Sequence, residues 1–286
     1  MSEPPVTPAD PISPAEFLSS APKGVGGNTP WAAGYGAQIR RAWLEHAAED
    51  ARTVQKHLGP SELGVECDRQ VAGKMAGLPA TNHVVDPWPS IRGRALHRMG
   101  EDVFSSDNLR RGLLRWVVEQ RVTPMLEHPG TADLYDAVER AVVDHKFLGE
   151  SSMSKVRKDP PRKYRVQLLL YGLGYRLLGL PVKRIVIAAY PATAASLDGL
   201  YVWEHVFSDE HDNLMPDVAA LLLQVFEETE KRKALAEQIT TGALGFLDVT
   251  PTPDSDECFF CPFYRPQAAK DSGPGCPGSV AVHAAY

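Results

Sequence analysis

The sequence predicts an α/β fold in which a mixed central sheet is flanked by helices. Helical patterns precede residue 115, short runs rich in β-branched residues fill the centre, and a long helical pattern follows them. The chain has 286 residues, 43% of them hydrophobic and 23% charged, which suffices for a sizeable core. We expect one domain over residues 36–278. It lies between a disordered tail at 1–35, rich in Pro, Ala, Gly and Ser, and a second tail at 279–286.

The individual elements follow from apolar spacing and boundary residues. Three helices are expected first. One spans about 37–58, a short one begins at the cap residue Ser61 and carries Cys67 and Arg69, and the third spans 90–114. Strands near 115–122, 130–137 and 140–147 come next, and the polar break between the last two suits a hairpin. The rest reads as a polar loop at 151–165, an apolar helix at 164–179, strands at 182–192 and 200–208, and a helix at 212–238.

Charge and hydropathy limit the classes of function. The net charge of −6 argues against nonspecific binding of nucleic acid, although a local basic patch can coexist with an acidic total. No apolar run approaches the roughly 20 residues that a membrane span needs, so no membrane partner is expected. The first residues also lack the charged-then-apolar plan of a secretory signal, and we expect a cytoplasmic protein.

The stretch Val142-Val143-Asp144-His145-Lys146-Phe147 places three titratable residues in a strand that should be buried. Asp144 and Lys146 point to one face of the strand and His145 to the other. If the preceding strand pairs as a hairpin, Asp133 lies near Asp144, and two carboxylates in one pocket repel each other unless a cation sits between them. Mg²⁺ or Mn²⁺ suits such ligands. A lone Asp-x-Lys, however, is more often a surface salt bridge on an edge strand.

The neighbours of this tripeptide form an ordered series. In chain order they are "GRALH" ending at His97, "GTAD" ending at Asp133, "DHK" with Asp144 and Lys146, and "QLLLY" with Gln167 and Tyr171. This series resembles the RecB-like branch of the PD-(D/E)XK nuclease superfamily, which implies a restriction-endonuclease-like core.

The resemblance implies a role for each residue of the series. It makes His97, Asp133 and Asp144 metal ligands, together with the backbone carbonyl of His145. Its catalytic set is completed by Lys146, the catalytic lysine, and by two residues that would position the DNA strand or that lysine, Gln167 and Tyr171. Core packing in a Leu-rich helix is the alternative for Tyr171, and a partly exposed helix position is the alternative for His97.

Four cysteines, Cys67, Cys258, Cys261 and Cys276, are more suited to binding a metal than to disulfides in a cytosolic chain. A CxxC turn lets two thiolates reach one metal, and four thiolates suit zinc or an iron-sulfur cluster equally well. The nuclease resemblance extends to the iron-sulfur exonucleases associated with CRISPR adaptation and to the helicase-nuclease AddB, with one cysteine before the nuclease motifs and three after them. It implies a structural 4Fe-4S cap formed by Cys67 and the segment 258–276. The long spacing to Cys276 departs from that pattern, and zinc or unliganded thiols remain alternatives.

A basic run behind the catalytic strand is a candidate DNA contact, because cationic side chains there could follow phosphates. Its members are Lys155, Arg157, Lys158, Arg162, Lys163 and Arg165. An exposed loop is the alternative interpretation.

The sequence therefore predicts a Mg²⁺- or Mn²⁺-dependent exonuclease acting on DNA, most simply single-stranded DNA from an end. The resemblance implies a role in phage or mobile-element recombination, repair or spacer processing, with a helicase or a recombination or CRISPR-adaptation partner. The alternatives are a noncatalytic DNA-binding or adaptor module and a structure-specific endonuclease.

Overall fold

The computed structural model describes residues 26–49, 58–82, 88–252, 256–266, 268 and 274–278. The chain divides into two compact units, residues 1–55 and 56–286. The first unit contains helix α2 (Pro30–Glu49). Residues 30–35, predicted as tail, are its first turns. The Thr29 hydroxyl accepts the Ala32 amide at 3.1 Å, and Pro30 follows the cap, a start signal present in the sequence. The predicted continuation of this helix over 50–57 lies outside the described residues.

The second unit is built on a five-stranded sheet in the order β1-β2-β3-β4-β5. Its strands are β1 (Trp116–Val122), β2 (Gly130–Asp136), β3 (Ala141–Leu148), β4 (Arg184–Pro191) and β5 (Tyr201–Val206). All neighbours are antiparallel except β3 and β4, which are parallel. A parallel pair needs a crossover connection, and α6 (Glu150–Lys158) and α7 (Arg162–Leu177) supply it. The predicted mixed α/β sheet is confirmed.

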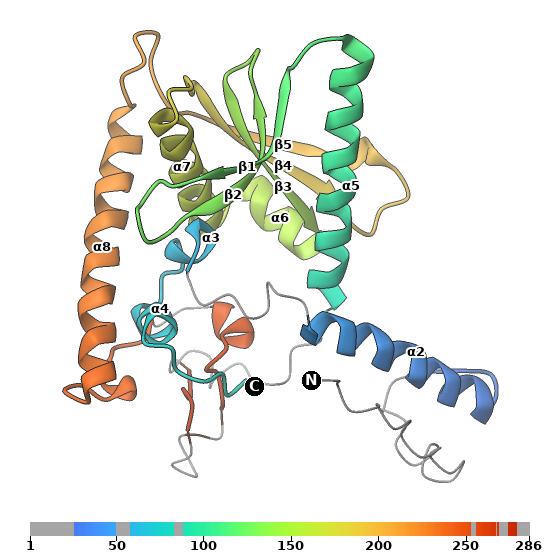
Figure 1. Cartoon of the computed structure of the whole chain (residues 1–286). Coiled ribbons are helices and arrows are strands. Elements are labelled where there is room, and N and C mark those ends of the chain that lie inside the picture. The colour runs from blue at the N-terminus through green and yellow to red at the C-terminus, as the bar shows by residue number, and fades with distance from the viewer. Residues whose placement is uncertain are drawn as a thin grey trace, which may run out of the picture. The chain divides into compact units, whose positions relative to one another are not determined.

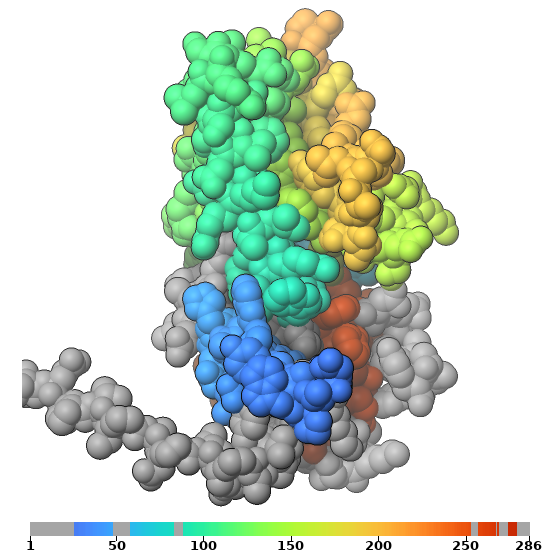
Figure 2. Space-filling view, turned by 90° about the vertical axis from the view of Figure 1, so that its right-hand side faces the viewer, coloured from blue at the N-terminus to red at the C-terminus, as the bar shows by residue number. Residues whose placement is uncertain are grey.

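The strand β3 serves two helices because its side chains alternate between the faces of the sheet. One face packs on α7, which buries Val166, Leu168 and Leu170 in the main core. The other face presents His145 and Phe147 to α5 (Trp88–Arg111). Figure 1 shows α5 and α7 on either side of the strands. In Figure 2, α5 runs along the outside of the unit, and none of its residues is fully buried.

The predicted polar loop at 151–165 is wrong, because this segment forms α6 and the first turn of α7. Helix α6 buries only two residues, Met153 and Val156, which lie three positions apart on one helix face, so the apolar spacing that would predict a helix is weak. The Pro160-Pro161 pair ends the first helix and starts the second. Polar residues on the remaining face of α6 concealed the helix in the sequence.

The segment before the sheet forms two short helices instead of the single helix expected from Ser61. They are α3 (Pro60–Leu63) and α4 (Asp68–Met75), and Cys67 is the N-cap of the second. Helix α8 (Pro216–Thr241) holds this segment through Arg232, which is 1% exposed. Its guanidinium donates to Asp68 Oδ1 at 2.8 Å and to the carbonyls of Leu63 and Val65, both at 2.9 Å. None of the described helices has the length and hydropathy to cross a membrane.

Candidate active site and cysteine cluster

The candidate site lies where β2 and β3 separate. Their antiparallel pairing includes Leu134 opposite Val143 and does not extend to Asp133 and Asp144. There the ladder is replaced by a side-chain contact, because the backbone N–H of His145 donates to Asp133 Oδ2 at 2.7 Å. Asp133 and Asp144 are therefore the first residues beyond the point where the two strands stop pairing, close together as the predicted hairpin requires.

His97 comes to this site from α5. Its Nδ1 is 3.4 Å from Asp133 Oδ2. Burial acts to lower the pKa of His97, but the hydrogen bond and the negative charge of Asp133 outweigh it and raise the pKa above its usual value. A histidine nitrogen and a carboxylate oxygen this close to each other form a ligand pair suited to a divalent cation.

Aromatic packing fixes the position of α5. Phe104 stacks on the His145 ring at 5.3 Å between centroids and meets Trp116 edge-on at 5.1 Å. His97 itself packs edge-on against Phe147 at 5.4 Å. The His145 ring is thus part of the contact between the helix and the sheet, and burial lowers its pKa to about 4. The ring lies on the α5 side of β3, the face opposite Lys146, as the strand alternation predicted.

On the opposite face of β3, Lys146 Nζ lies 2.7 Å from Asp144 Oδ2. Asp144 is 1% exposed, and neither of its carboxylate oxygens accepts a hydrogen bond of regular geometry. Burial, with the nearby charge of Asp133, raises the pKa of Asp144 to about 6 despite the attraction of Lys146. Burial also disfavours the charged lysine, but Asp144 holds the pKa of Lys146 above its usual value. The bland alternative, a surface salt bridge, does not describe this pair, because it is buried.

The helix α7 contributes the two remaining residues of the series, Gln167 and Tyr171, on the Lys146 side of β3. Gln167 Oε1 accepts a hydrogen bond from Lys146 Nζ at 3.0 Å, and Gln167 Nε2 donates to the Tyr171 hydroxyl at 3.2 Å. Tyr171 is 5% exposed and packs in the main core, as the core-packing alternative expected. Its ring passes so close to Gly130 that a Cβ on that glycine would lie 2.9 Å from Tyr171 Cε1. The glycine of "GTAD" therefore makes room for the tyrosine of "QLLLY".

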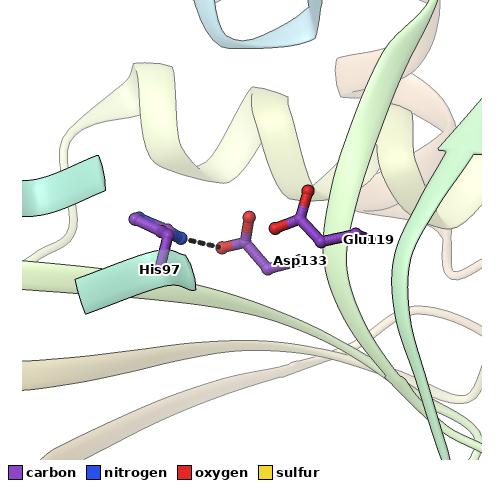
Figure 3. A group of neighbouring side chains, drawn as sticks. All are labelled: His97, Glu119 and Asp133. Atoms are coloured by element: carbon purple, nitrogen blue, oxygen red, sulfur yellow. Dashed lines mark ion pairs between the residues drawn. The ribbon is translucent and has the colours of Figure 1, made fainter. Parts of the chain in front are cut away.

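One residue of the site was missed in the sequence. His97, Glu119 and Asp133 are the group, among the residues that the structure describes, whose metal-ligand atoms all lie within 4.8 Å of one another. Figure 3 shows Asp133 between the other two side chains, with a ring nitrogen of His97 facing the Asp133 carboxylate. Glu119 belongs to β1 and carries no motif of its own. Only the strand register, which places it across from Asp133, could have indicated it.

The four cysteines, distant in sequence, line one small pocket, and none of them forms a disulfide. Cys67, Cys261 and Cys276 are buried and Cys258 is partly exposed. Burial, followed by the neighbouring thiols, raises the pKa of Cys261 to about 11, so a cation is needed to hold it as a thiolate. Within the described part of the chain, no three cysteine sulfurs lie within 4.8 Å of one another. Four thiolates on one tetrahedral zinc would be about 3.8 Å apart.

Arg69 lies in the same pocket and is 7% exposed. Its Nη1 lies 3.0 Å from Cys276 Sγ, while Nε and Nη2 donate to the carbonyls of Val249 and Leu247 at 2.6 and 2.7 Å. No carboxylate among the described residues pairs with it. The donor set of four sulfurs and the buried cation beside it fit a negatively charged metal-thiolate group, because a buried charge requires a counter-charge.

The six predicted DNA-contacting residues fall into two groups. Lys155, Arg157 and Lys158 are exposed on α6. Arg162 instead binds Glu228 of α8 through two contacts at 3.0 and 2.8 Å, and Lys163 Nζ lies 2.9 Å from Glu257. The remaining one, Arg165, has a loose ion pair with Asp159 at 3.7 Å. In the exposed group, Arg157 Nη2 donates to the Gly199 carbonyl at 3.2 Å.

Comparisons with known proteins add little to this geometry. No family model matches the sequence, and no curated protein matches it significantly. A solved phage-related exonuclease from Haemophilus somnus 129PT is similar in structure, with 12% identity, coverage of 62% of this chain and 82% of that chain, and a TM-score of 0.38. A second solved structure, SSO0001, is similar with 15% identity, coverage of 79% and 92%, and a TM-score of 0.39.

Proposed function

We propose that this protein is a divalent-metal-dependent nuclease of the PD-(D/E)XK type. The observation that carries the proposal is the convergence of Asp133, Asp144 and Lys146 at the split between β2 and β3. Two carboxylates and a buried lysine from consecutive strands have no use in packing that apolar residues would not serve better. They are the groups that hydrolysis of a phosphodiester bond requires.

The ligands of the metal would be His97, Asp133 and Asp144, with the carbonyl of His145. A bound Mg²⁺ or Mn²⁺ would stabilise charge on the phosphate and lower the pKa of a bound water. Asp144 suits this role because its Oδ1 is buried and accepts no hydrogen bond. The raised pKa of Lys146 keeps it an ammonium ion. It would offset negative charge at the reacting phosphate, and Gln167 orients it through the 3.0 Å hydrogen bond.

We also propose that the four cysteines hold a 4Fe-4S cluster. Support comes from their common pocket and from the buried guanidinium beside them. Because Cys67 precedes the sheet and the other three follow α8, such a group would join the two ends of the second unit.

The substrate of the proposed nuclease is DNA, most simply single-stranded DNA entered from an end. The exposed cations of α6, Lys155, Arg157 and Lys158, would contact its phosphates. We assign the activity to phage or mobile-element recombination, repair or spacer processing, where a helicase or adaptation partner would supply the strand.

The test is digestion of 5′- and 3′-labelled linear DNA, single- and double-stranded, and of circular single-stranded DNA. Wild type, Asp144→Asn, and the matched exposed-acid control Glu101→Gln on α5 are compared in Mg²⁺, in Mn²⁺ and in EDTA. We expect cleavage of linear DNA by wild type and Glu101→Gln in the presence of metal, and loss by at least about a hundredfold in Asp144→Asn.

The other outcomes each have a meaning. DNA binding without metal-dependent cleavage by the wild type would replace the proposal with a noncatalytic DNA-binding module. Cutting of the circle would assign an endonuclease. Equal cleavage by wild type and Asp144→Asn would refute the site.

A further inference from the structure

The strand β1 places Glu119 directly across from Asp133. The flanking pairs are Val118 opposite Leu134 and Gln120 opposite Ala132, whereas Glu119 and Asp133 form no such pair. Like charges directly opposite each other on one face of a sheet destabilise it. At this point two half-buried carboxylates face each other across a short gap.

The backbone of Glu119 adds to this cost. Its φ of 48° is in the left-handed region, which a residue other than glycine enters at a cost of about 1–2 kcal/mol. The same conformation interrupts the ladder between β1 and β2. A strained acid opposite a second acid is best explained by a ligand that binds both of them.

The donor atoms indicate the nature of that ligand. Glu119 and Asp133 each offer a carboxylate oxygen and His97 offers an imidazole nitrogen, and these three atoms lie within 4.8 Å of one another. Independently of Glu119, the buried Asp144 Oδ1 accepts no hydrogen bond. Both observations favour a divalent cation in this space.

We propose that Glu119 is a ligand of that cation, together with His97 and Asp133. This inference deepens the proposed nuclease function and rests on it. The first strand of the sheet then contributes to the site, although the ordered motifs assign it no residue. Binding of the cation would remove the repulsion between the two facing carboxylates, so it would also tie β1 to β2 at the point where their ladder is broken.

The test measures Mn²⁺ binding directly, by calorimetry and by the paramagnetic resonance signal of free Mn²⁺, without substrate. The variants are Glu119→Gln, the positive control Asp133→Asn, and Glu101→Gln, whose side chain is exposed on α5. We expect Glu119→Gln and Asp133→Asn to lose about tenfold or more in Mn²⁺ affinity and Glu101→Gln to match the wild type.

Thermal unfolding separates a ligand from a structural residue. We expect Glu119→Gln to gain less in Tm than the wild type when Mn²⁺ replaces EDTA, because it lacks one carboxylate ligand. Wild-type affinity in Glu119→Gln, with loss in Asp133→Asn, would overturn this inference and leave the nuclease proposal intact. No Mn²⁺ binding by the wild type would instead count against the proposed function.

A second and independent observation concerns Arg69. Its guanidinium is buried and pairs with no carboxylate among the described residues, and its Nη1 lies 3.0 Å from Cys276 Sγ. Hydrogen bonds to cluster sulfurs are among the factors that set a cluster's reduction potential. We infer that Arg69 is a positioning residue of the cysteine site, which neutralises thiolate charge at Cys276 and raises the potential of the bound cluster.

The test compares anaerobically purified wild type, Arg69→Lys and Arg69→Gln by visible absorption, iron and sulfide content, and redox titration. We expect Arg69→Gln to shift the potential negative by about 59 mV or more, a tenfold change in the ratio of oxidised to reduced cluster, and Arg69→Lys to shift it less. A cluster with unchanged potential in Arg69→Gln overturns the inference. A wild type without iron and sulfide rejects the cluster itself.

Discussion

Replacing Lys146 by methionine should destabilise the metal-free protein as well as abolish cleavage. Lys146 is the partner of a carboxylate that is 1% exposed, and the two atoms that form the pair are 2.7 Å apart. Removing one member of a buried ion pair leaves an uncompensated charge and costs about 3–5 kcal/mol. In a unit that spans residues 56–286 this corresponds to a fall in Tm of roughly 6–20 °C.

The assay is thermal and urea unfolding in EDTA, for wild type, Lys146→Met, Asp144→Asn and the double variant. Because the double variant removes both charges, we expect it to recover most of the stability lost in Lys146→Met. Added Mn²⁺ should also recover part of it, since a cation replaces the lost ammonium ion. A Lys146→Met protein as stable as the wild type in EDTA would refute the view that this pair is buried and coupled.

Three further predictions concern the site and its supports. Gly130→Ala should cost about 1–3 kcal/mol and reduce cleavage, because its Cβ would meet Pro60 and Tyr171 atoms at under 3 Å; stability and DNA digestion are measured together. Arg232→Met should cost about 3–5 kcal/mol in urea unfolding, since it leaves Asp68 and two carbonyls without their buried donor. Without metal, the contribution of Asp144 to stability should be present below pH 3.8 and lost as the pH rises through about 6, because burial raises its pKa. Asp144→Asn should flatten that part of the pH profile, and an unchanged profile would contradict the assignment.

Much of the sheet could be predicted, because each strand is a short β-branched run between polar breaks. The register followed as well: a hairpin between β2 and β3 brings Asp133 to Asp144, and alternation along β3 separates the His145 ring from Lys146. These inferences depend only on the period of a strand and the length of a turn. The sequence therefore predicted the geometry of the carboxylates before any contact was visible.

The parts that could not be predicted depend on contacts between distant segments. Glu119 has no local signal, because its role arises from a left-handed backbone and from its neighbour across the strand. The helix α6 was hidden because only Met153 and Val156 face the core. Arg162 looked like a DNA contact in a basic run, yet it is paired with Glu228 of α8. In each case the deciding partner is far away in the chain.

The single hydrogen bond from the His145 amide to the Asp133 carboxylate has a consequence for how the site can be observed. That amide is protected from exchange with solvent only while the end of β3 and the carboxylate remain together. Its hydrogen-exchange rate therefore reports the opening of the strand end and the loss of the ligand geometry as one event. A cation that draws Asp133 toward itself competes with the same amide, so the exchange rate of one backbone proton would register the arrival of metal in the absence of DNA.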